Sequence, residues 1–208
     1  MANTDLRTVE YLISIMEMRD PNLNGHSLHI EKLSLLLYDA LPTPMRLTVR
    51  RNDLAYAALF HDIGQVGVTG TISKAGKLTS DERAAVSRHP EISVEILKQI
   101  DGYKKILKGI RYHHERMDGK GYDGISSDRI PLISKILAIA DTFSAVTVLK
   151  SYKPSRTYED GISALKLGAG KQFDAELVEY FSLIPRHKVI ECAEDVRKEI
   201  SIIESIIY

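Results

Sequence analysis

The chain has a single cysteine, no excess of charge of either sign and no long uninterrupted hydrophobic run. Cys192 has no partner within the chain, which excludes an internal disulfide bond and favours a reducing compartment. The 28 Lys and Arg residues balance the 28 Asp and Glu residues, so no net field attracts the molecule to duplex nucleic acid or to an acidic membrane. Any anionic ligand must therefore be attracted by local charge.

The hydrophobic segments are also interrupted by charge. The longest, residues 136–149, is too short to span a membrane and contains Asp141, and the first ten residues lack the apolar stretch of a signal peptide. A chain of 208 residues can bury a substantial core, and no linker or low-complexity segment divides it. We therefore expect one cytoplasmic domain over residues 1–208, with Cys192 buried as a small apolar side chain on the last helix.

Apolar residues recur every three or four positions along most of the chain, and no sustained alternation marks a strand. This pattern predicts an all-α fold. Thr79-Ser80-Asp81-Glu82 is a capping box that predicts a helix start, and glycines predict irregular segments at about 64–76 and 115–129. We expect helices at about 5–19, 25–40, 53–62, 90–100, 103–114 and 131–150, others starting at 79 and 157, and two C-terminal helices within about 174–208 on either side of Pro185.

Five of the seven histidines lie, with two aspartates, inside or at the ends of expected helices. His61 and Asp62 directly follow an apolar run, and Asp141 interrupts another, so these groups need a partner that offsets the cost of burial. His26 and His89, taken singly, have an ordinary alternative as solvated or helix-end histidines. The whole set predicts a site for two transition-metal ions and a metal-dependent hydrolase. Its members are His26, His61, Asp62, His89, His113, His114 and Asp141.

Three further residues lie close to these ligands in the sequence. Glu115 and Asp118 follow the paired histidines, and carboxylates next to metal-binding histidines commonly accept the second ring N–H and orient the imidazole. We expect this supporting role for both. His29, one helical turn after His26, is expected on the substrate side or at the surface.

Several short motifs occur in an order that resembles the HD-GYP family of HD-domain phosphohydrolases. They are Leu59-Phe60-His61-Asp62-Ile63-Gly64, Lys77-Leu78-Thr79, His89-Pro90, His113-His114-Glu115 with Asp118-Gly119-Lys120-Gly121-Tyr122, Ile139-Ala140-Asp141 and Phe173-Asp174. The resemblance covers about residues 20–180. It implies an HD-domain-like helical bundle with additional C-terminal helices. It also implies a buried metal centre that hydrolyses a cyclic dinucleotide, chiefly cyclic di-GMP to linear pGpG, in bacterial signalling.

The family's metal motif matches all seven candidate ligands, which implies two divalent ions bridged by Asp62. In such a centre the ions lie roughly 3.5–4 Å apart, activate a bridging hydroxide and neutralise the phosphodiester. Ligation by imidazole and carboxylate without thiolate favours Fe or Mn, and then Zn or Ni. The resemblance also implies that Asp62 and Gln65 occupy catalytic positions.

Four positions outside the segment 150–153 depart from the family's pattern. Relatives often have a glutamate at the position of Asn22, where it binds a third metal, so we expect two ions rather than three. Gln65 replaces a lysine that commonly lies near the substrate phosphate, which predicts weaker phosphate binding or leaving-group assistance. Asp123 replaces the proline of the Gly-Tyr-Pro motif and adds negative charge near the site entrance, and Ser144 replaces a second aspartate in a supporting position.

The resemblance places the substrate near two lysines and two tyrosines. Lys150 and Lys153 keep the positive charge of the family's arginines but not their bidentate geometry. Tyr122 and Tyr152 are expected to stack on a purine. The alternatives are lysines that complement the end of a helix and tyrosines that anchor their loops. Relatives are also thought to contact partners such as GGDEF-type cyclases through the loop at 121–123.

Two other functions stay open. The changes at Gln65, Asp123 and Ser144 are compatible with a catalytically weak or silent signalling module, although no ligand is missing. An HD phosphohydrolase acting on another nucleotide would use a similar set of ligands. The apolar stripes of the first and last helices are expected to pack within the fold, with a homodimer as the alternative.

Overall fold

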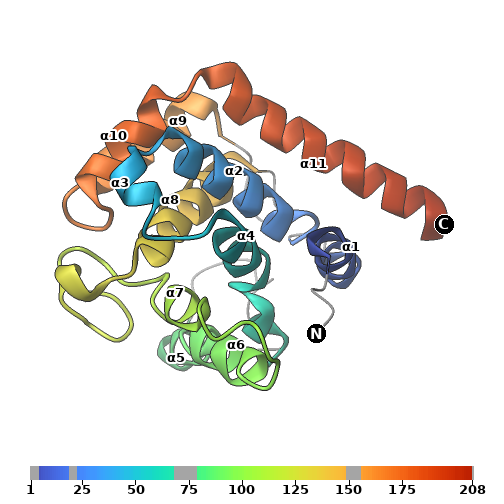
Figure 1. The fold of residues 1–208 in the computed structure, drawn as a ribbon, viewed down its shortest axis with the longest axis horizontal. Coiled ribbons are helices and arrows are strands. Elements are labelled where there is room, and N and C mark those ends of the chain that lie inside the picture. The colour runs from blue at the N-terminus through green and yellow to red at the C-terminus, as the bar shows by residue number, and fades with distance from the viewer. Residues whose placement is uncertain (1–4, 19–22, 68–78, 149–155, 208) are drawn as a thin grey trace.

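The computed structural model describes residues 5–18, 23–67, 79–148 and 156–207, and this part of the chain is built mainly from helices (Figure 1). Within it the only β contact is an isolated bridge between Ala169 and Phe173. The predicted all-α class is therefore confirmed. In chain order the elements are α1 (Leu6–Glu17), α2 (His26–Ala40), α3 (Thr43–Arg46), α4 (Arg51–Phe60), the 3-10 helix η1 (Ile63–Gly67), α5 (Ser80–Val86), α6 (His89–Leu97), α7 (Leu107–Arg111), the 3-10 helix η2 (Ser127–Arg129), α8 (Leu132–Thr147), α9 (Tyr158–Gly168), α10 (Ala175–Leu183) and α11 (Arg186–Ile207).

Helix α2 forms the centre of the fold and packs against α1, α4, α8, α10 and α11. Most of its side chains are buried, among them Leu28, Ile30, Leu33 and Leu37. Helix α8, which packs against α2, is also largely apolar and buried (Figure 1). A helix that is buried on most sides needs a surrounding core for its stability. Polar residues on these two helices, such as His26 of α2 and Ser144 of α8, are therefore held in the interior of the fold.

The ends of several helices follow local sequence signals. Thr79 Oγ1 accepts a hydrogen bond from Glu82 N, and the Glu82 carboxylate accepts one from Thr79 N, which confirms the predicted capping box at the start of α5. Thr157 and Asp160 form the same motif at the start of α9. Pro185 separates α10 from α11, as expected.

The segment from 103 to 114 differs from the continuous helix that we predicted. Residues 101–106 form turns around Gly102, whose φ is 109°, and only Leu107–Arg111 is helical. Tyr112 then leaves the helical region with φ −106° and ψ 17°. His113 and His114 therefore lie just beyond a helix end rather than inside a helix.

Two smaller differences concern helix ends. Pro42 and Pro44 end α2 as predicted, but they also start the short helix α3, because proline is tolerated in the first turn of a helix. Helix α8 ends at Thr147, where Val148 turns to an extended conformation, and not near residue 150.

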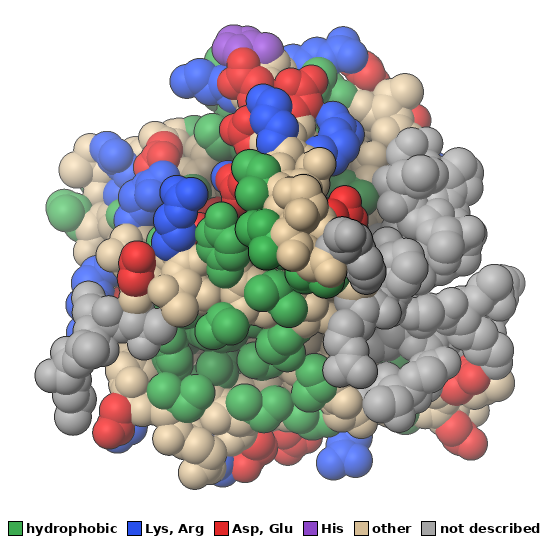
Figure 2. Space-filling view, turned by 90° about the vertical axis from the view of Figure 1, so that its right-hand side faces the viewer, with side chains coloured by type: hydrophobic (Ala, Val, Ile, Leu, Met, Phe, Trp, Pro, Cys, Tyr) green, Lys and Arg blue, Asp and Glu red, His purple; other side chains and the backbone are tan. Residues whose placement is uncertain are grey.

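Figure 2 looks onto the side of the molecule where α1 and the end of α11 lie, and hydrophobic side chains gather there. Val9 and Ile13 of α1 are buried, whereas Leu12 and Ile15 are exposed. The apolar stripe of α1 thus packs only in part within the fold.

Cys192 is buried on α11, as predicted. Within the described ranges, no helix combines the length and apolar character needed to cross a membrane.

Candidate metal centre

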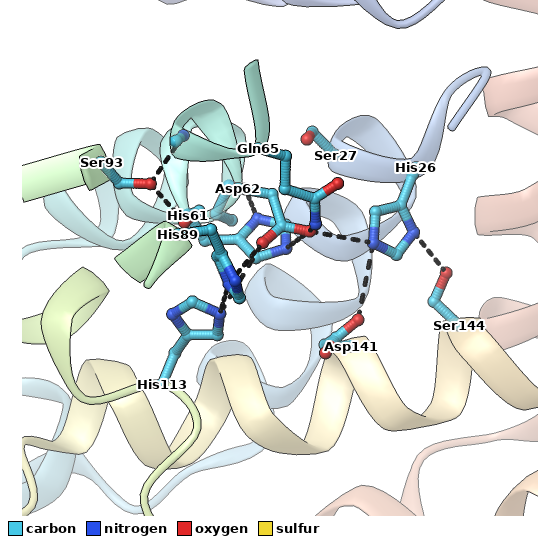
Figure 3. A network of polar contacts seen from close by, with 12 residues as sticks. His26, Ser27, His61, Asp62, Gln65, His89, Ser93, His113, Asp141 and Ser144 are labelled. Atoms are coloured by element: carbon cyan, nitrogen blue, oxygen red, sulfur yellow. Dashed lines mark hydrogen bonds and ion pairs between the residues drawn. The ribbon is translucent and has the colours of Figure 1, made fainter. Parts of the chain in front are cut away.

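Five of the predicted ligands, all histidines, surround a sixth, Asp62, which follows the end of α4. Its oxygen Oδ1 lies 3.0 Å from His89 Nε2 and 3.9 Å from His113 Nε2. Its oxygen Oδ2 lies 3.3 Å from His61 Nε2 and 3.9 Å from His26 Nε2. The carboxylate therefore faces two groups of imidazoles (Figure 3). We call them the Oδ1 half, made of His89, His113 and His114, and the Oδ2 half, made of His26 and His61.

Three of these imidazoles are oriented by the main chain. The Nδ1 atoms of His61, His89 and His113 donate to the carbonyls of Ala58, Val86 and Ile110 respectively, each over 2.7 Å and each three residues back along the chain. The acceptors lie in the last turns of α4, α5 and α7, where helix carbonyls lack partners within the helix. Because a carbonyl only accepts, each ring carries a proton on Nδ1, so the nitrogen that can bind a metal ion is Nε2, which faces Asp62.

The atoms that converge on Asp62 fit a cation. His89 Nε2 and His113 Nε2 are 3.3 Å apart, and in the neutral rings both protons are on Nδ1, so neither ring has a proton for this contact. Facing lone pairs repel each other unless they share a cation. His61 Nε2 and Asp62 Oδ1 are buried and have no hydrogen-bond partner among the described residues. Imidazole and carboxylate donors in this number suit divalent transition-metal ions.

His26 is oriented differently, because it is the first residue of α2 and follows no helix end at the same spacing. Its Nε2 lies 3.5 Å from Asp141 Oδ1 and its Nδ1 lies 3.5 Å from Ser144 Oγ, so α8 contacts both nitrogens of the ring (Figure 3). Ser144 Oγ also lies 3.0 Å from His29 Nδ1. His29 is buried rather than at the surface, and burial lowers its pKa to about 3, which keeps the ring neutral.

The charge state of the centre is governed by Asp62. Burial raises the pKa of this carboxyl, but attraction to the neighbouring imidazoles, His61 first, outweighs burial and holds the pKa well below its ordinary value. Burial also acts against a charged His61, yet Asp62 raises the pKa of His61 to about 9. In the Oδ1 half burial lowers the pKa of His113 and His114, the latter to about 4. His113 and His114 therefore offer neutral imidazoles beside an anionic carboxylate.

Main-chain contacts at Gly64 join the two halves. Gly64 N donates to Ser93 Oγ over 2.8 Å, and Ser93 Oγ donates to His61 O over 3.0 Å. A Cβ at residue 64 would lie 2.2 Å from His89 O, so only glycine lets η1 approach α6 this closely. Sequence reasoning missed Ser93, because a serine inside a helix gives no signal of such a contact.

Two further side chains support the centre. Gln65 Nε2 donates to Asp62 Oδ2, so the residue that replaces the family's lysine contacts the central carboxylate (Figure 3). Glu17 of α1 accepts from Ser27 N over 3.0 and 3.3 Å, and so caps the start of α2 next to His26. The sequence did not identify Glu17, because this cap comes from a different helix.

The carboxylates that follow the paired histidines hold the next loop instead of orienting the imidazoles. Glu115 is buried and accepts from Asp123 N over 2.6 Å and from Ile125 N over 2.9 Å. Asp118 forms two hydrogen bonds with Arg116, of 2.9 and 2.8 Å. The orienting role that we expected of Glu115 and Asp118 is taken in this structure by main-chain carbonyls.

A cavity of about 230 Å³ opens beside the Oδ1 half. Tyr122 lines it, half exposed, with its ring centroid 4.7 Å from that of His114. Lys120 and Gln172 line the same cavity. Sequence reasoning placed Tyr122 near the substrate but missed these two, although Lys120 lies inside a motif that was recognised.

The remaining predicted residues fall into two groups. Asp123 pairs with Arg111 through contacts of 2.8 Å, so the negative charge that we expected near the site entrance is compensated by α7. Asn22, Lys150, Tyr152 and Lys153 lie outside the described residues, and their expected roles stay predictions.

Comparison with known proteins places the chain in a family. The family model described as HD domain matches residues 10–177. The chain belongs to the HD-domain family. Its expected relation to the HD-GYP proteins is also confirmed. Among solved structures, Bd1817, an HDG"Y"P protein from Bdellovibrio bacteriovorus, has a TM-score of 0.61 at 15% identity, over 85% of this chain and 59% of that one, which supports the fold alone.

Two curated relatives of this HD domain come from Vibrio cholerae serotype O1. One is named "Probable cyclic di-GMP phosphodiesterase" and is 31% identical over 90% of this chain and 46% of its own length. The other is named "3'3'-cGAMP-specific phosphodiesterase 3" and is 30% identical over 78% of this chain and 35% of its own length. The chain thus spans less than half the length of these relatives.

Proposed function

We propose that this HD domain is a metal-dependent phosphodiesterase that hydrolyses a cyclic dinucleotide, with cyclic di-GMP as the first candidate substrate and linear pGpG as its product. One observation carries the proposal: the two oxygens of Asp62 face imidazole nitrogens of two separate groups. The names of the two Vibrio relatives support the class of substrate.

In the proposed centre, Asp62 and the two groups of imidazoles would hold two divalent ions. The donor set favours Fe or Mn, and then Zn or Ni. Two such ions supply Lewis acidity for water and charge neutralisation for the phosphodiester. The proposed ligands are His26, His61, Asp62, His89, His113, His114 and Asp141.

The chain's own residues prepare this site. The carbonyls of Ala58, Val86 and Ile110 hold the Nδ1 protons and so keep the opposite ring nitrogens available. Gln65 binds one oxygen of Asp62 and restricts its rotation. A neutral amide binds phosphate more weakly than a lysine, so we propose slow turnover.

The cavity beside the Oδ1 half is the proposed entrance for the substrate. Tyr122 presents an aromatic ring on which a purine can stack, and Lys120 presents a cation for a phosphate. Lys150, Tyr152 and Lys153 keep their expected part in substrate binding, on the strength of the family resemblance alone.

Loading the metal-free protein anaerobically with Fe(II) or Mn(II) tests the proposal. The loaded protein is incubated with cyclic di-GMP, 3′3′-cGAMP and deoxynucleoside triphosphates, and the products are separated by chromatography. We expect a linear dinucleotide, and none after treatment with a chelator. Full metal occupancy without turnover of any cyclic dinucleotide would favour a silent signalling module. Turnover of the triphosphates alone would favour another HD phosphohydrolase.

We also propose a setting and partners for this activity. The proposed substrate supports a cytoplasmic location. The packing of α11 against α2 supports one domain over residues 1–208. A GGDEF-type cyclase at the loop 121–123 is one proposed partner. A second copy of the chain, on the hydrophobic face of Figure 2, is the other, and light scattering in solution distinguishes a homodimer from a monomer.

A further inference from the structure

Two pairs of polar residues, each three positions apart, face each other where α2 meets α8. Helix α2 supplies His26 and His29, and helix α8 supplies Asp141 and Ser144. The Ser144 hydroxyl lies 3.0 Å from His29 Nδ1 and 3.5 Å from His26 Nδ1. All three of these side chains are buried. A single hydroxyl therefore connects a proposed metal ligand to a histidine outside the centre.

Two arrangements give the hydroxyl proton an acceptor. A third, in which both rings donate to the two lone pairs of Ser144 Oγ, would leave the hydroxyl proton without an acceptor among the described residues. The hydroxyl has one proton to donate, and each neutral imidazole carries one N–H. In the first arrangement His26 Nδ1–H donates to Ser144 Oγ, Ser144 donates to His29 Nδ1, and the His29 proton is on Nε2. In the second arrangement both bonds run the other way, so the proton of His29 is on Nδ1 and the proton of His26 is on Nε2.

The two arrangements have different consequences for metal binding. In the first, His26 Nε2 carries a lone pair and can bind an ion. In the second, His26 Nε2–H points toward Asp141 Oδ1, 3.5 Å away, and cannot bind one. His29 Nε2 is buried without a hydrogen-bond partner among the described residues, so no other described contact fixes the tautomer of His29.

We propose that Ser144 is a positioning residue that couples the tautomers of His26 and His29, so that an ion binds in the Oδ2 half only when His29 carries its proton on Nε2. This inference rests on the proposed metal centre. The Oδ1 half is outside this coupling, because carbonyls orient His89 and His113.

Binding of Mn(II) to the full chain tests the proposal without any turnover. Ser144→Ala removes the acceptor of the His26 Nδ1 proton, and loss of such a supporting contact weakens metal binding by roughly 10- to 100-fold. We expect this loss for one of the two ions in a calorimetric titration. The matched control is Ser134→Ala, which removes another buried hydroxyl of α8, one that donates to Gly109 O over 2.7 Å, and it should leave both affinities unchanged.

A second variant separates coupling from simple packing. His29→Leu leaves Ser144 as an acceptor for His26 and removes the competing partner, so this variant should bind both ions at least as tightly as the parent protein. Equal affinities in the parent protein and in Ser144→Ala would overturn the proposal, as would equal losses in Ser144→Ala and Ser134→Ala or a loss in His29→Leu. A parent protein that binds no Mn(II) would instead overturn the metal centre itself.

Nuclear magnetic resonance of the parent protein tests the tautomers directly, and it does not depend on the folding of a variant. Long-range ¹H–¹⁵N correlations distinguish a proton on Nδ1 from one on Nε2. With diamagnetic Zn(II) bound, we expect His26 to be protonated on Nδ1 and His29 on Nε2. A His29 that keeps its proton on Nδ1 after Zn(II) binds would contradict the coupling.

Discussion

The two halves of the histidine centre are built in different ways. In the Oδ1 half, His89 and His113 come from one continuous stretch of chain, residues 80–114, and main-chain carbonyls orient both rings. In the Oδ2 half, His26 depends on Asp141 and on Ser144, which is 118 residues away along the chain. The described contacts of the Oδ1 half are therefore local, whereas the Oδ2 half combines His61, which the carbonyl of Ala58 orients, with His26, which side chains of a distant helix contact.

This difference indicates where substitutions change the centre. Every residue supplies a carbonyl, so an imidazole oriented by the main chain is insensitive to the identity of its acceptor residue. An imidazole oriented by a serine depends on that serine and on the packing of two helices. We infer that a sequence change such as Ser144 alters metal binding through His26 in the Oδ2 half, whereas the orientation of His89 and His113 in the Oδ1 half depends on the backbone.

The largest effect is expected from Asp62→Ala, which removes the one side chain common to both halves. Both ions should be lost, and activity should fall by about 10³-fold or more, because each tenfold corresponds to about 1.4 kcal/mol and a metal centre supplies several. Elemental analysis and product chromatography measure the two losses. The control is Asp39→Ala, an exposed aspartate paired with Arg51. Retention of one ion by Asp62→Ala would show that the halves do not depend on a common ligand.

A smaller effect is expected when one half is removed at a time. His89→Ala should lose the ion of the Oδ1 half and keep the other, because the contacts of His26 and His61 with Asp62 Oδ2 are unchanged. His26→Ala should do the reverse. Metal content after dialysis against a weak chelator should fall from two equivalents to one in both variants. Loss of both ions in either variant would contradict two separable halves.

The part of this centre that could be predicted from the sequence is the set of side chains. Apolar runs broken by His61-Asp62 and by Asp141 indicated buried polar groups, and family resemblance supplied their common role. The sequence also indicated the all-α fold, the cap at Thr79 and the break at Pro185, because helix periodicity and capping are local properties.

The contacts that orient the ligands could not be predicted in the same way. We expected Glu115 to orient imidazoles, but it binds two loop N–H groups, and the carbonyl acceptors depend on where α4, α5 and α7 end. Because we predicted a continuous helix over 103–114, we did not predict the helix end at Arg111 that precedes His113. The contact of Ser144 with His26 depends on how α2 packs on α8, which no local pattern in the sequence reveals.

A partial effect on both halves is expected from Gly64→Ala. The new Cβ would lie 2.2 Å from His89 O and 2.6 Å from Ser93 N, so η1 must move away from α6. Overpacking of this kind costs about 1–3 kcal/mol, and the movement should weaken the binding of Mn(II) in both halves. Thermal unfolding and calorimetric titration measure these changes. Gly67→Ala is the matched control in the same 3-10 helix, because its Cβ would meet only the flexible side chain of Ile92 at 3.2 Å. Similar losses in both variants would show that the close approach at Gly64 is not required.

The smallest effect on metal binding is expected from Glu31→Gln, although Glu31 lies on α2 like His26. Glu31 is buried beside Glu10, and burial, followed by that neighbouring charge, raises its pKa from 4.5 to about 7. Between pH 4.5 and about pH 7, Glu31 is protonated in the folded protein but ionised in the unfolded chain. The free energy of unfolding therefore falls as the pH rises through this range. At about 1.4 kcal/mol per pKa unit the loss is up to roughly 3 kcal/mol.

Glu31→Gln should remove this pH-dependent loss in denaturant unfolding of the metal-free protein, whereas the exposed control Glu194→Gln should keep it. Both variants should bind two equivalents of Mn(II), because the Oδ2 half depends on contacts at the start of α2 and on α8. If Glu31→Gln lost an ion, the dependence of that half would extend along α2 beyond its contacts with Asp141 and Ser144.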